Sequence, residues 1–391
     1  MKICLVSPYD FAVPGGVGNH ISQIAAQYNK LGHEVVISAP SSRRSIELPY
    51  ARFIPIGTPV GVPAGGSVAR IAVSLAGGHE VEELSRQEGF DVVHVHEPMM
   101  PALPYHFLRY SSALNVGTFH AAQEGGNLMY RFTTPLMKRW FGKLHGKIAV
   151  SPAASRLISR YFPAAYTVIP NGIDTERFRI DVPAIPELDD GKLNILFLGR
   201  PEKRKGLRYL LRAFAQVRAE VANVRLVVVG RDSKLMQSHR EWVQRRGISD
   251  VVFTGYVSDA DVPRYYRTAD IYCAPNIGSE SFGLVLIEAM ACGTPIVASN
   301  IEGFADVVTH GVDGLLTTPE DADAIAAALL QLIKSPDVRQ EMAIKGHARA
   351  QDYSWDQIGR RIISYYELIA YERSGATSRA MESGERSGAP A

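Results

Sequence analysis

The chain has 391 residues, of which 46% are hydrophobic and 21% charged, and its formal net charge at pH 7 is +2. This length favours two domains of ordinary size, and the composition is that of a globular protein with a large core. So small a net charge gives no general electrostatic reason to bind nucleic acid, and attraction to an anionic surface would need a local patch.

Cysteine usage and the length of apolar runs indicate the compartment. Cys4, Cys273 and Cys292 are too few and too scattered for a disulfide framework, and they form no C-x-x-C zinc pair. They lie in or beside apolar runs, which predicts buried free thiols in a reducing compartment. The first strand is too short for a signal-peptide core, and no stretch reaches the roughly 18 apolar residues of a membrane span. We therefore expect a cytoplasmic protein whose membrane contact is peripheral.

Short β-branched runs alternate with longer helical stretches along the chain. Strands are expected at 2–6, 34–39, 52–56, 91–96, 115–119, 147–150, 166–169, 194–198, 225–229, 251–254, 271–274, 296–298 and 314–316, and the helical stretches include 18–31 and 67–88. Nearly continuous apolar strands separated by helices are typical of parallel sheets covered on both faces. The pattern predicts an α/β protein of doubly wound, Rossmann-like sheets.

Turn residues divide the chain into two domains. Pro170-Asn171-Gly172-Ile173-Asp174 is turn chemistry, and the stretch after it shows little periodicity before a new strand begins. We expect one domain at 1–171, a second at 190–354, and a helix at 355–371 that crosses back to the first domain. Residues 373–391 are rich in Ser, Gly, Glu and Arg, which predicts a disordered tail. Because ligands of open α/β sheets bind beyond the carboxyl ends of strands, functional residues are expected just after each strand.

A glycine-rich turn follows the first strand. Pro14-Gly15-Gly16-Val17-Gly18 opens a helix, where glycine lets the backbone approach a phosphate and the helix start supplies amide groups. The turn lacks the Gly-Lys-Ser/Thr of a P-loop and the last glycine of G-x-G-x-x-G. It predicts either phosphate contact or tight packing of the strand against the helix.

Basic residues follow the first strand of the second domain. Gly199-Arg200 comes directly after that strand, and Lys203-Arg204-Lys205-Gly206 leads into a helix. Arg200 and Lys205 could converge on a diphosphate, since one follows a strand and the other precedes a helix. The alternative is that these are ordinary solvated side chains.

Two glutamates separated by seven residues form the strongest motif. Glu280 lies in the loop after the strand at 271–274, a helix is expected to start near Gly283, and Glu288 lies about a turn into it. The amides of Phe282, Gly283 and Leu284 would point at a ligand and favour phosphate. The carboxylate of Glu280, in the loop, can bind sugar hydroxyls, and that of Glu288, one turn into the helix, can bind a ribose. The alternatives are a dipole-stabilising carboxylate for Glu280 and a surface charge for Glu288, although the apolar neighbours of Glu288 imply a partner.

Three histidines lie at the ends of two strands. His94 and His96 are two residues apart on one strand, so they face one side and could be metal ligands. No third ligand is apparent in the sequence, so structural packing is favoured and no metal site is predicted. His120 ends the next strand, where a residue of the ligand site is expected.

Together these motifs resemble glycosyltransferase family 4 of the GT-B fold, in which two Rossmann-like, doubly wound domains face each other across a cleft. The resemblance covers residues 1–371 and rests on the two glutamates, the motif 199–206, the turn 170–174 and the Gly15-Gly16 loop. The chain is most similar to the phosphatidylinositol α-mannosyltransferases. The matching stretches are Pro8-Tyr9, Pro14-Gly15-Gly16-Val17, Gly32-His33-Glu34-Val35, Gly66-Ser67-Val68-Ala69-Arg70, His94-Val95-His96-Glu97-Pro98 and Thr118-Phe119-His120.

The resemblance implies a role for each motif, with an acceptor-binding N-terminal domain and a C-terminal domain that binds the nucleotide sugar. The implied acceptor-binding residues are Tyr9, Ser67 and Arg70. The implied donor-binding residues are Gly16 at the diphosphate, Val257 at the base, Phe282, Gly283 and Leu284 at the helix start, and Glu288 at the ribose. The implied catalytic residues are His120 near the reacting sugar, Arg200 and Lys205 at the leaving diphosphate, and Glu280 at the transferred sugar.

The implied reaction is the retaining transfer of a hexose from a nucleotide sugar, with GDP-mannose favoured, to a lipid head group such as phosphatidylinositol at the inner face of the cell membrane. Arg200 and Lys205 would stabilise the charge that grows on the leaving diphosphate. In the family the acceptor attacks the face that the nucleotide leaves and the departing phosphate takes its proton, so no general base is assigned. No Asp-x-Asp metal motif is evident near the site, and the sequence requires no cofactor, although Mg²⁺ could accompany the nucleotide. The oligomeric state is open.

Two segments differ from the phosphatidylinositol mannosyltransferases and leave the acceptor open. Residues 121–125 lack the lysine expected to meet a lipid phosphate, and residues 79–84 are acidic where those relatives have a basic amphipathic helix. The alternatives are a UDP-glucose-dependent enzyme acting on diacylglycerol or another glycolipid precursor, and one acting on a soluble sugar or inositol phosphate. The basic stretch 138–147, with Trp140 and Phe141, is either a membrane-facing surface or an ordinary exposed helix with two core aromatics.

Overall fold

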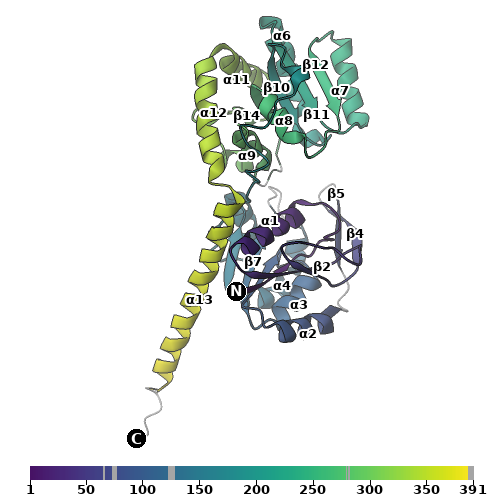
Figure 1. Ribbon diagram of the computed structural model, residues 1–391. Coiled ribbons are helices and arrows are strands. Elements are labelled where there is room, and N and C mark those ends of the chain that lie inside the picture. Colours follow the sequence, from purple (N-terminus) through teal and green to yellow (C-terminus); the bar gives the residue numbers. More distant parts are fainter. Residues whose placement is uncertain (65–66, 73–76, 122–127, 279, 281, 386–391) are drawn as a thin grey trace. The chain divides into compact units, whose positions relative to one another are not determined.

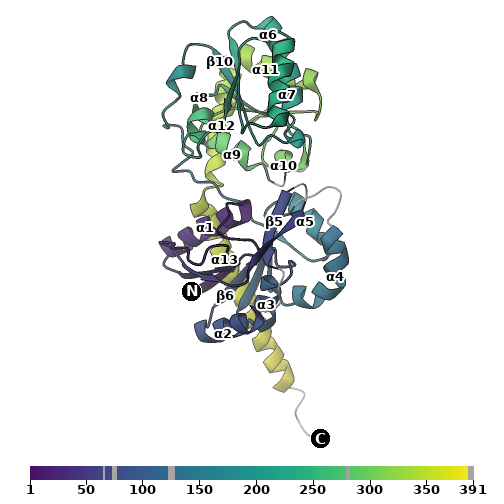
Figure 2. The same cartoon turned by 90° about the vertical axis from the view of Figure 1, so that its right-hand side faces the viewer.

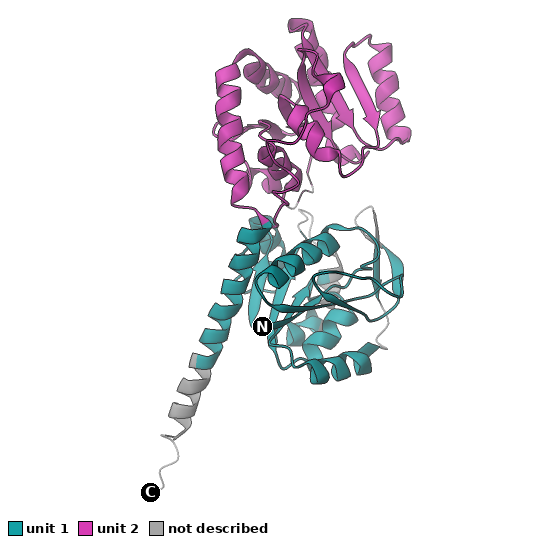
Figure 3. Cartoon of the chain, viewed as in Figure 1, with its two compact units in different colours: residues 1–170, 355–391 teal, residues 171–354 magenta. Residues whose placement is uncertain are grey.

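The computed structural model describes the chain except residues 65–66, 73–76, 122–127, 279, 281 and 386–391, and the chain divides into two compact units (Figures 1 and 3). Unit 1 comprises residues 1–170 and 355–391, and unit 2 comprises residues 171–354. The segment between residues 171 and 190, expected to join the domains, belongs to unit 2, because Ile173 and Phe178 are buried in the core of that unit.

Unit 1 contains a seven-stranded sheet with the strand order β3-β2-β1-β6-β7-β8-β9, whose described pairings are all parallel. Its strands are β1 (Lys2–Val6), β2 (Glu34–Ala39), β3 (Arg52–Pro55), β6 (Val92–His96), β7 (Leu114–Phe119), β8 (Gly146–Ala149) and β9 (Thr167–Val168). Its helices are α1 (Gly16–Lys30), α2 (Gly78–Glu88), α3 (Leu103–Tyr110), α4 (Leu128–Phe141), α5 (Pro152–Ser159) and α13 (Trp355–Glu385). Helices α1 and α13 cover one face of the sheet and α2 to α5 the other (Figures 1 and 2), which explains why the central strands are buried along nearly their whole length.

Helix α13 is longer than the sequence indicates. It packs on the sheet and on α1 through Trp355, Ile362 and Tyr366, and it continues past Tyr371 to Glu385. A disordered tail was expected from residue 373, whereas α13 continues to Glu385. The rest of the expected tail, 386–391, lies outside the described residues.

A β-hairpin replaces the first part of the helix that was expected at 67–88. Strands β4 (Pro59–Ala64) and β5 (Ser67–Ala72) pair antiparallel, and α2 begins only at Gly78. The expectation was wrong for 67–72 because it ignored the preceding β-branched residues, which supply cross-strand partners such as Val60 opposite Ile71.

Unit 2 contains a six-stranded sheet with the strand order β12-β11-β10-β13-β14-β15, again with parallel described pairings. Its strands are β10 (Leu193–Leu198), β11 (Val224–Val229), β12 (Val251–Gly255), β13 (Ile271–Ala274), β14 (Ile296–Ser299) and β15 (Leu315–Thr317). Its helices are α6 (Leu207–Glu220), α7 (Lys234–Arg245), α8 (Val262–Thr268), α9 (Leu284–Ala291), α10 (Glu302–Ala305), α11 (Ala322–Lys334) and α12 (Pro336–Gln351), with 3-10 turns η2 (Pro186–Leu188) and η3 (Lys203–Lys205). One core cluster lies under α6, α7 and α11 and another under α8, α9 and α10, so both faces of this sheet are covered as well.

The predicted α/β class with doubly wound parallel sheets is confirmed. The three cysteines are buried and free, as the sequence predicted. Among the described residues, none of the helices combines the length and the apolar character that crossing a bilayer requires.

Candidate functional site

In unit 2, the carboxylate of Glu280 is the centre of a polar cluster. Its Oε2 accepts hydrogen bonds from Lys205 Nζ at 2.7 Å, Asn276 Nδ2 at 2.9 Å and Arg204 Nη1 at 3.4 Å. The structure thus brings together Lys205 and Glu280, which the sequence singled out separately. It adds Arg204 and the buried Asn276, which the sequence analysis did not assign; the position of Asn276 two residues after the end of β13 was the available signal.

A required glycine places Lys205 beside the end of β13. Gly206 has φ +71°, and a Cβ there would lie 1.7 Å from the carbonyl oxygen of Pro275. The amide of Ile277 also donates to the carbonyl of Arg204 at 2.8 Å. Only glycine permits this close backbone approach, so the Lys-Gly dipeptide brings η3 and its cations to the loop that carries Glu280.

Arg200 lies in the loop between β10 and η3, and no salt bridge joins it to Glu280 among the described residues. Its side chain is 67% exposed, and Nη1 pairs with Glu202 Oε1 at 3.0 Å. Glu202 Oε2 in turn accepts from Arg204 Nε at 2.7 Å. The loop therefore carries a chain of alternating charges, in which Arg200 is the cation most open to a ligand.

The start of α9 lies where the sequence placed it. Phe282 is buried, Gly283 has φ +75° and precedes the helix, and Leu284 is its first residue. A Cβ on Gly283 would lie 2.9 Å from the ring of Phe304, so the left-handed turn is also sterically restricted to glycine. The proposed contact of these backbone amides with a phosphate remains a prediction.

Glu288 has the partner that its apolar surroundings required. The hydroxyl of Tyr266, a fully buried residue of α8, donates to Glu288 Oε2 at 3.1 Å. Burial raises the pKa of the Glu288 carboxyl to about 7, although the Tyr266 hydrogen bond opposes this shift. Val257, the predicted base-pocket residue, packs partly buried at the edge of the same apolar cluster.

In unit 1, the residues predicted to bind diphosphate and acceptor lie after β1 and on the β4–β5 hairpin. Gly16 is the first residue of α1, and a Cβ there would meet nothing within 4 Å, so its backbone borders open space. Tyr9 forms a bridge with Ile71 of β5, and burial raises the pKa of its phenol. The side chain of Ser67 lies outside the described residues. Tyr9 is thus next to the hairpin that carries Arg70.

The buried carboxylate of Asp10 is an additional member of this group. Arg70 Nε donates to Asp10 Oδ2 at 3.1 Å, and the amide of Asp10 donates to the carbonyl of Arg70 at 2.8 Å. Asp10 is 3% exposed, whereas the Arg70 side chain is 48% exposed. Asp10 therefore fixes the predicted acceptor residue Arg70, and the sequence analysis missed it because nothing in sequence joins positions 60 residues apart.

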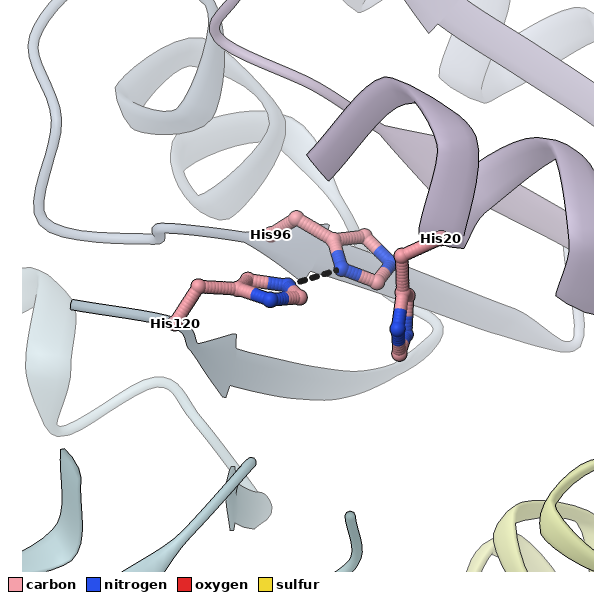
Figure 4. Close-up of side chains that lie close together, drawn as sticks. All are labelled: His20, His96 and His120. Atoms are coloured by element: carbon pink, nitrogen blue, oxygen red, sulfur yellow. Dashed lines mark hydrogen bonds between the residues drawn. The ribbon is translucent and has the colours of Figure 1, made fainter. Parts of the chain in front are cut away.

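Three histidines gather at the ends of β6 and β7 (Figure 4). His96 ends β6, His120 follows β7, and His20 comes from α1. His96 Nδ1 and His120 Nε2 share a hydrogen bond of 3.0 Å, and the His20 ring meets both of the others edge-on, at centroid distances of 5.2 and 4.8 Å. His20 is the third member that the sequence could not supply, because it lies in a different segment from the strand ends.

Two of these imidazoles, those of His96 and His120, are uncharged. Burial, reinforced by the neighbouring imidazoles, lowers the pKa of His96 and His120 well below the usual value. His94 lies next to His96 on β6, with its two nitrogens hydrogen-bonded to Tyr366 and Thr118 at 2.6 Å each, and burial lowers its pKa to about 3. The role of His94 is thus packing at the strand end.

The same three imidazoles could serve as metal ligands only after rearrangement. One ligand nitrogen from each of His20, His96 and His120 lies within 4.8 Å of the others. Nitrogens on a tetrahedral zinc ion, at Zn–N distances of about 2.0–2.1 Å, are roughly 3.3 Å apart. The rings would have to draw together and give up the hydrogen bond between His96 and His120.

The basic stretch 138–147 was interpreted either as a membrane-facing surface or as an exposed helix with two core aromatics, and it contains both exposed cations and partly buried aromatic residues. Trp140 and Phe141 pack partly buried against the core, while Lys138 and Arg139 are exposed. Arg139 and Lys143 lie 5.3 and 5.7 Å from the Trp140 ring centroid. Within the described part of the chain, none of these three cations forms a salt bridge with an acidic group, so the stretch is a local positive patch.

Two family models match almost the whole chain in succession. "Glycosyltransferase Family 4" matches residues 14–177 and "Glycosyl transferases group 1" matches residues 179–349. The phosphatidyl-myo-inositol mannosyltransferase of Mycolicibacterium smegmatis is 35% identical, covering 98% of this chain and all of the relative. The protein of the same name from Propionibacterium freudenreichii is 34% identical and covers 99% and 100%.

Solved structures agree on the fold. A glycosyltransferase from Rickettsia africae superposes with a TM-score of 0.74 at 18% identity, covering 94% of this chain and 98% of its own. The Anabaena protein HepE, solved with UDP, also gives a TM-score of 0.74, at 20% identity, with 94% and 100% covered. At these identities the likeness concerns architecture alone.

Proposed function

The chain belongs to the GT-B glycosyltransferases of family 4, in the group that contains the phosphatidyl-myo-inositol mannosyltransferases, and from that membership we propose that it is a retaining enzyme transferring mannose from GDP-mannose to phosphatidylinositol. The names of its relatives supply the sugar and the acceptor. Transfer would take place at the inner face of the cell membrane, with the enzyme bound peripherally.

The cluster around Glu280 is the observation that carries the proposal. It places a carboxylate suited to sugar hydroxyls within hydrogen-bond distance of Lys205, beside a loop whose Arg200 is exposed. A nucleotide sugar joins these two requirements in one molecule, since its hexose offers hydroxyls and its diphosphate offers negative charge. Glu288, held by Tyr266, would bind the ribose of the same donor.

Charge development explains why fixed cations would accelerate the reaction. As the bond between hexose and diphosphate breaks, the sugar becomes oxocarbenium-like and the diphosphate gains negative charge. Lys205 and Arg200 would stabilise that charge more strongly in the transition state than in the ground state. The acceptor hydroxyl would attack the face that the nucleotide leaves, and the departing phosphate would take its proton. No side chain is assigned as general base, and a Mg²⁺ ion carried by the nucleotide would add to the charge stabilisation.

The surface of α2 supports a second candidate acceptor. Its exposed residues include Glu80, Glu82 and Glu83, which an anionic leaflet would repel. A neutral acceptor such as diacylglycerol, or a soluble sugar or inositol phosphate, would not depend on a basic α2, and UDP-glucose is the alternative donor for such an enzyme. Membrane contact would then use the positive patch 138–147, with Trp140 and Phe141 beside the cations.

A screen of donors and acceptors tests the proposal. Purified enzyme would be incubated with GDP-mannose, UDP-glucose and related nucleotide sugars in the presence of lipid extract, and products would be identified by mass spectrometry. We expect a mannosylated phosphatidylinositol from GDP-mannose and none from Glu280→Gln. Glucosylated diacylglycerol from UDP-glucose would select the second candidate, and a soluble product with no co-sedimentation on vesicles would remove the lipid acceptor.

A further inference from the structure

Two consecutive residues, His96 and Glu97, hold His120 from two sides. His96 Nδ1 lies 3.0 Å from the His120 ring nitrogen Nε2. Glu97 Oε1 accepts hydrogen bonds from the backbone amides of His120 at 2.7 Å and Ala121 at 2.9 Å, and its Oε2 accepts one from the Tyr130 hydroxyl at 2.6 Å. One residue thus restrains the ring and the next restrains the backbone.

The contacts of Glu97 require an unfavourable backbone conformation and the burial of a carboxylate. Glu97 has φ +49°, a region that residues other than glycine rarely occupy, and its carboxylate is almost fully buried. Burial raises the pKa of that carboxyl, although its three hydrogen bonds oppose the shift. A strained backbone and a buried acid persist together where the surrounding contacts require them, which is common at functional sites.

The hydrogen bond between the two rings has a preferred direction. A neutral imidazole carries one N–H, so either His96 Nδ1–H donates to His120 Nε2, or His120 donates and His96 carries its proton on Nε2. His96 Nε2 is buried and has no hydrogen-bond partner among the described residues. Because a buried N–H without a partner is rarer than a buried lone pair without one, the first direction is favoured. His120 then accepts at Nε2 and carries its own proton on Nδ1.

We propose that His96 is a positioning residue that fixes His120 as the Nδ1–H tautomer and so offers this N–H to the transferred sugar. The inference rests on the proposed glycosyl transfer. His120 is partly exposed while His20 and His96 are buried, so His120 is the ring of the three that a ligand can reach. A neutral donor is suited to an oxocarbenium-like sugar, because it can hydrogen-bond a hydroxyl without placing a second positive charge beside the reacting carbon.

Kinetics of three variants test this role. His96→Phe removes the donor, whereas His96→Asn retains an N–H at the position of Nδ1. His94→Phe is the matched control, since His94 is also fully buried on β6 but bonds to Thr118 and Tyr366. We expect kcat to fall by about tenfold or more in His96→Phe, with the donor KM little changed, because the tautomer of a catalytic imidazole is no longer fixed. His96→Asn should stay within a few-fold of wild type, and His94→Phe should lower the melting temperature but not kcat.

A spectroscopic measurement keeps the inference testable without turnover. In protein with ¹⁵N-labelled histidine, the ring nitrogen shifts of His120 should report the Nδ1–H tautomer in the wild type and in His96→Asn. A His120 found as Nε2–H in the wild type would overturn the proposal, as would equal kcat losses in His96→Phe and His94→Phe. If the enzyme turns over no nucleotide sugar, the proposed function is wrong, but the spectrum still reports the tautomer of His120. If His96→Phe does not fold, the kinetics of His96→Asn and the wild-type spectrum test the role of His96.

Discussion

The imidazoles of His94, His96 and His120 in unit 1 are held neutral by burial, whereas the candidate residues around Glu280 in unit 2 are charged and partly exposed. Around His120, burial holds the imidazoles in their neutral form, and the one buried acid, Glu97, is occupied by hydrogen-bond donors. Around Glu280, two cations share one carboxylate oxygen, and Arg200 extends into solvent. The ends of β6 and β7 in unit 1 and the ends of β10 and β13 in unit 2 therefore have different electrostatic environments.

The proposed reaction requires both kinds of group. The diphosphate is anionic and gains charge as it leaves, so it benefits from fixed cations. The hexose is neutral and becomes positive, so it benefits from neutral hydrogen-bond donors. Each unit can be probed separately. Removing a cation from unit 2 should lower kcat, whereas protonating a buried histidine of unit 1 should lower the stability of that unit.

Lys205→Ala should have the largest effect. It removes a cation that lies 2.7 Å from Glu280 and is predicted to stabilise the leaving diphosphate. Loss of one such preorganised group costs about 10²- to 10³-fold in kcat. Lys203→Ala is the control, since Lys203 is an exposed residue of the same 3-10 turn. Steady-state kinetics with GDP-mannose measure both, and equal rates in the two variants would contradict the role of Lys205.

Acid should destabilise unit 1. His94 has a pKa of about 3 in the folded unit and about 6.5 when unfolded, so below pH 6.5 only the unfolded chain takes up the proton. Above pH 6.5, His94 does not lower the free energy of unfolding. Below pH 6.5, protonation of this one group in the unfolded chain lowers the free energy of unfolding by about 1.4 kcal/mol per pH unit, which amounts to about 2 kcal/mol at pH 5. Hydrogen exchange of unit 1 peptides, measured between pH 5 and 7.5, should show that His94→Phe loses less stability on acidification than the wild type. Parallel curves would contradict the buried neutral imidazole.

Unit 2 should respond to pH with the opposite sign at Glu288. Its pKa is about 7 folded and about 4.5 unfolded, so the folded unit retains a proton that the unfolded chain releases between these values. Stability falls as pH rises from 4.5 to 7 and is level above 7. Glu288→Gln removes this loss and should gain about 3 kcal/mol relative to the wild type across that interval. The test is denaturant unfolding at pH 5 and pH 8, where an equal difference at both values would show that Glu288 is not a titrating buried acid.

Much of this contrast follows from local sequence patterns. The strands are apolar because both faces of each sheet are covered, and Gly206 and Gly283 mark turns that only glycine permits. Gly-Arg, Lys-Gly and the glutamate pair each follow a strand, where ligand sites of parallel sheets lie. Each of these patterns involves only residues that are neighbours in the sequence. The sequence was therefore sufficient to predict the class of fold and that Lys205 and Glu280 lie after strands.

The partners of those residues could not be predicted, because they come from distant segments. His20 is 100 residues from His120 by their positions in the chain, and only the folding of α1 onto the sheet brings them together. Asp10 accepts a hydrogen bond from Arg70 of β5, a segment that was expected to be helical. Tyr266 and Asn276 looked like ordinary core and loop residues. Hydrogen bonds made by such residues depend on tertiary packing, which no local periodicity encodes.

Tyr266→Phe should have the smallest effect and gives the sharpest test of the ribose position. The hydroxyl of Tyr266 donates to Glu288 Oε2 at 3.1 Å, and its loss should raise the Glu288 pKa above about 7, because that hydrogen bond favours the ionised form. At pH 7 the donor KM should rise about five- to tenfold, the cost of one hydrogen bond, with kcat nearly unchanged. The difference should shrink by pH 9, where Glu288 is ionised in both proteins. Tyr265→Phe changes the adjacent, partly buried tyrosine of α8 and is the control. A KM increase that is independent of pH would mean that Tyr266 acts by packing alone. A KM increase of the same size in Tyr265→Phe would contradict the assignment of Glu288 to the ribose.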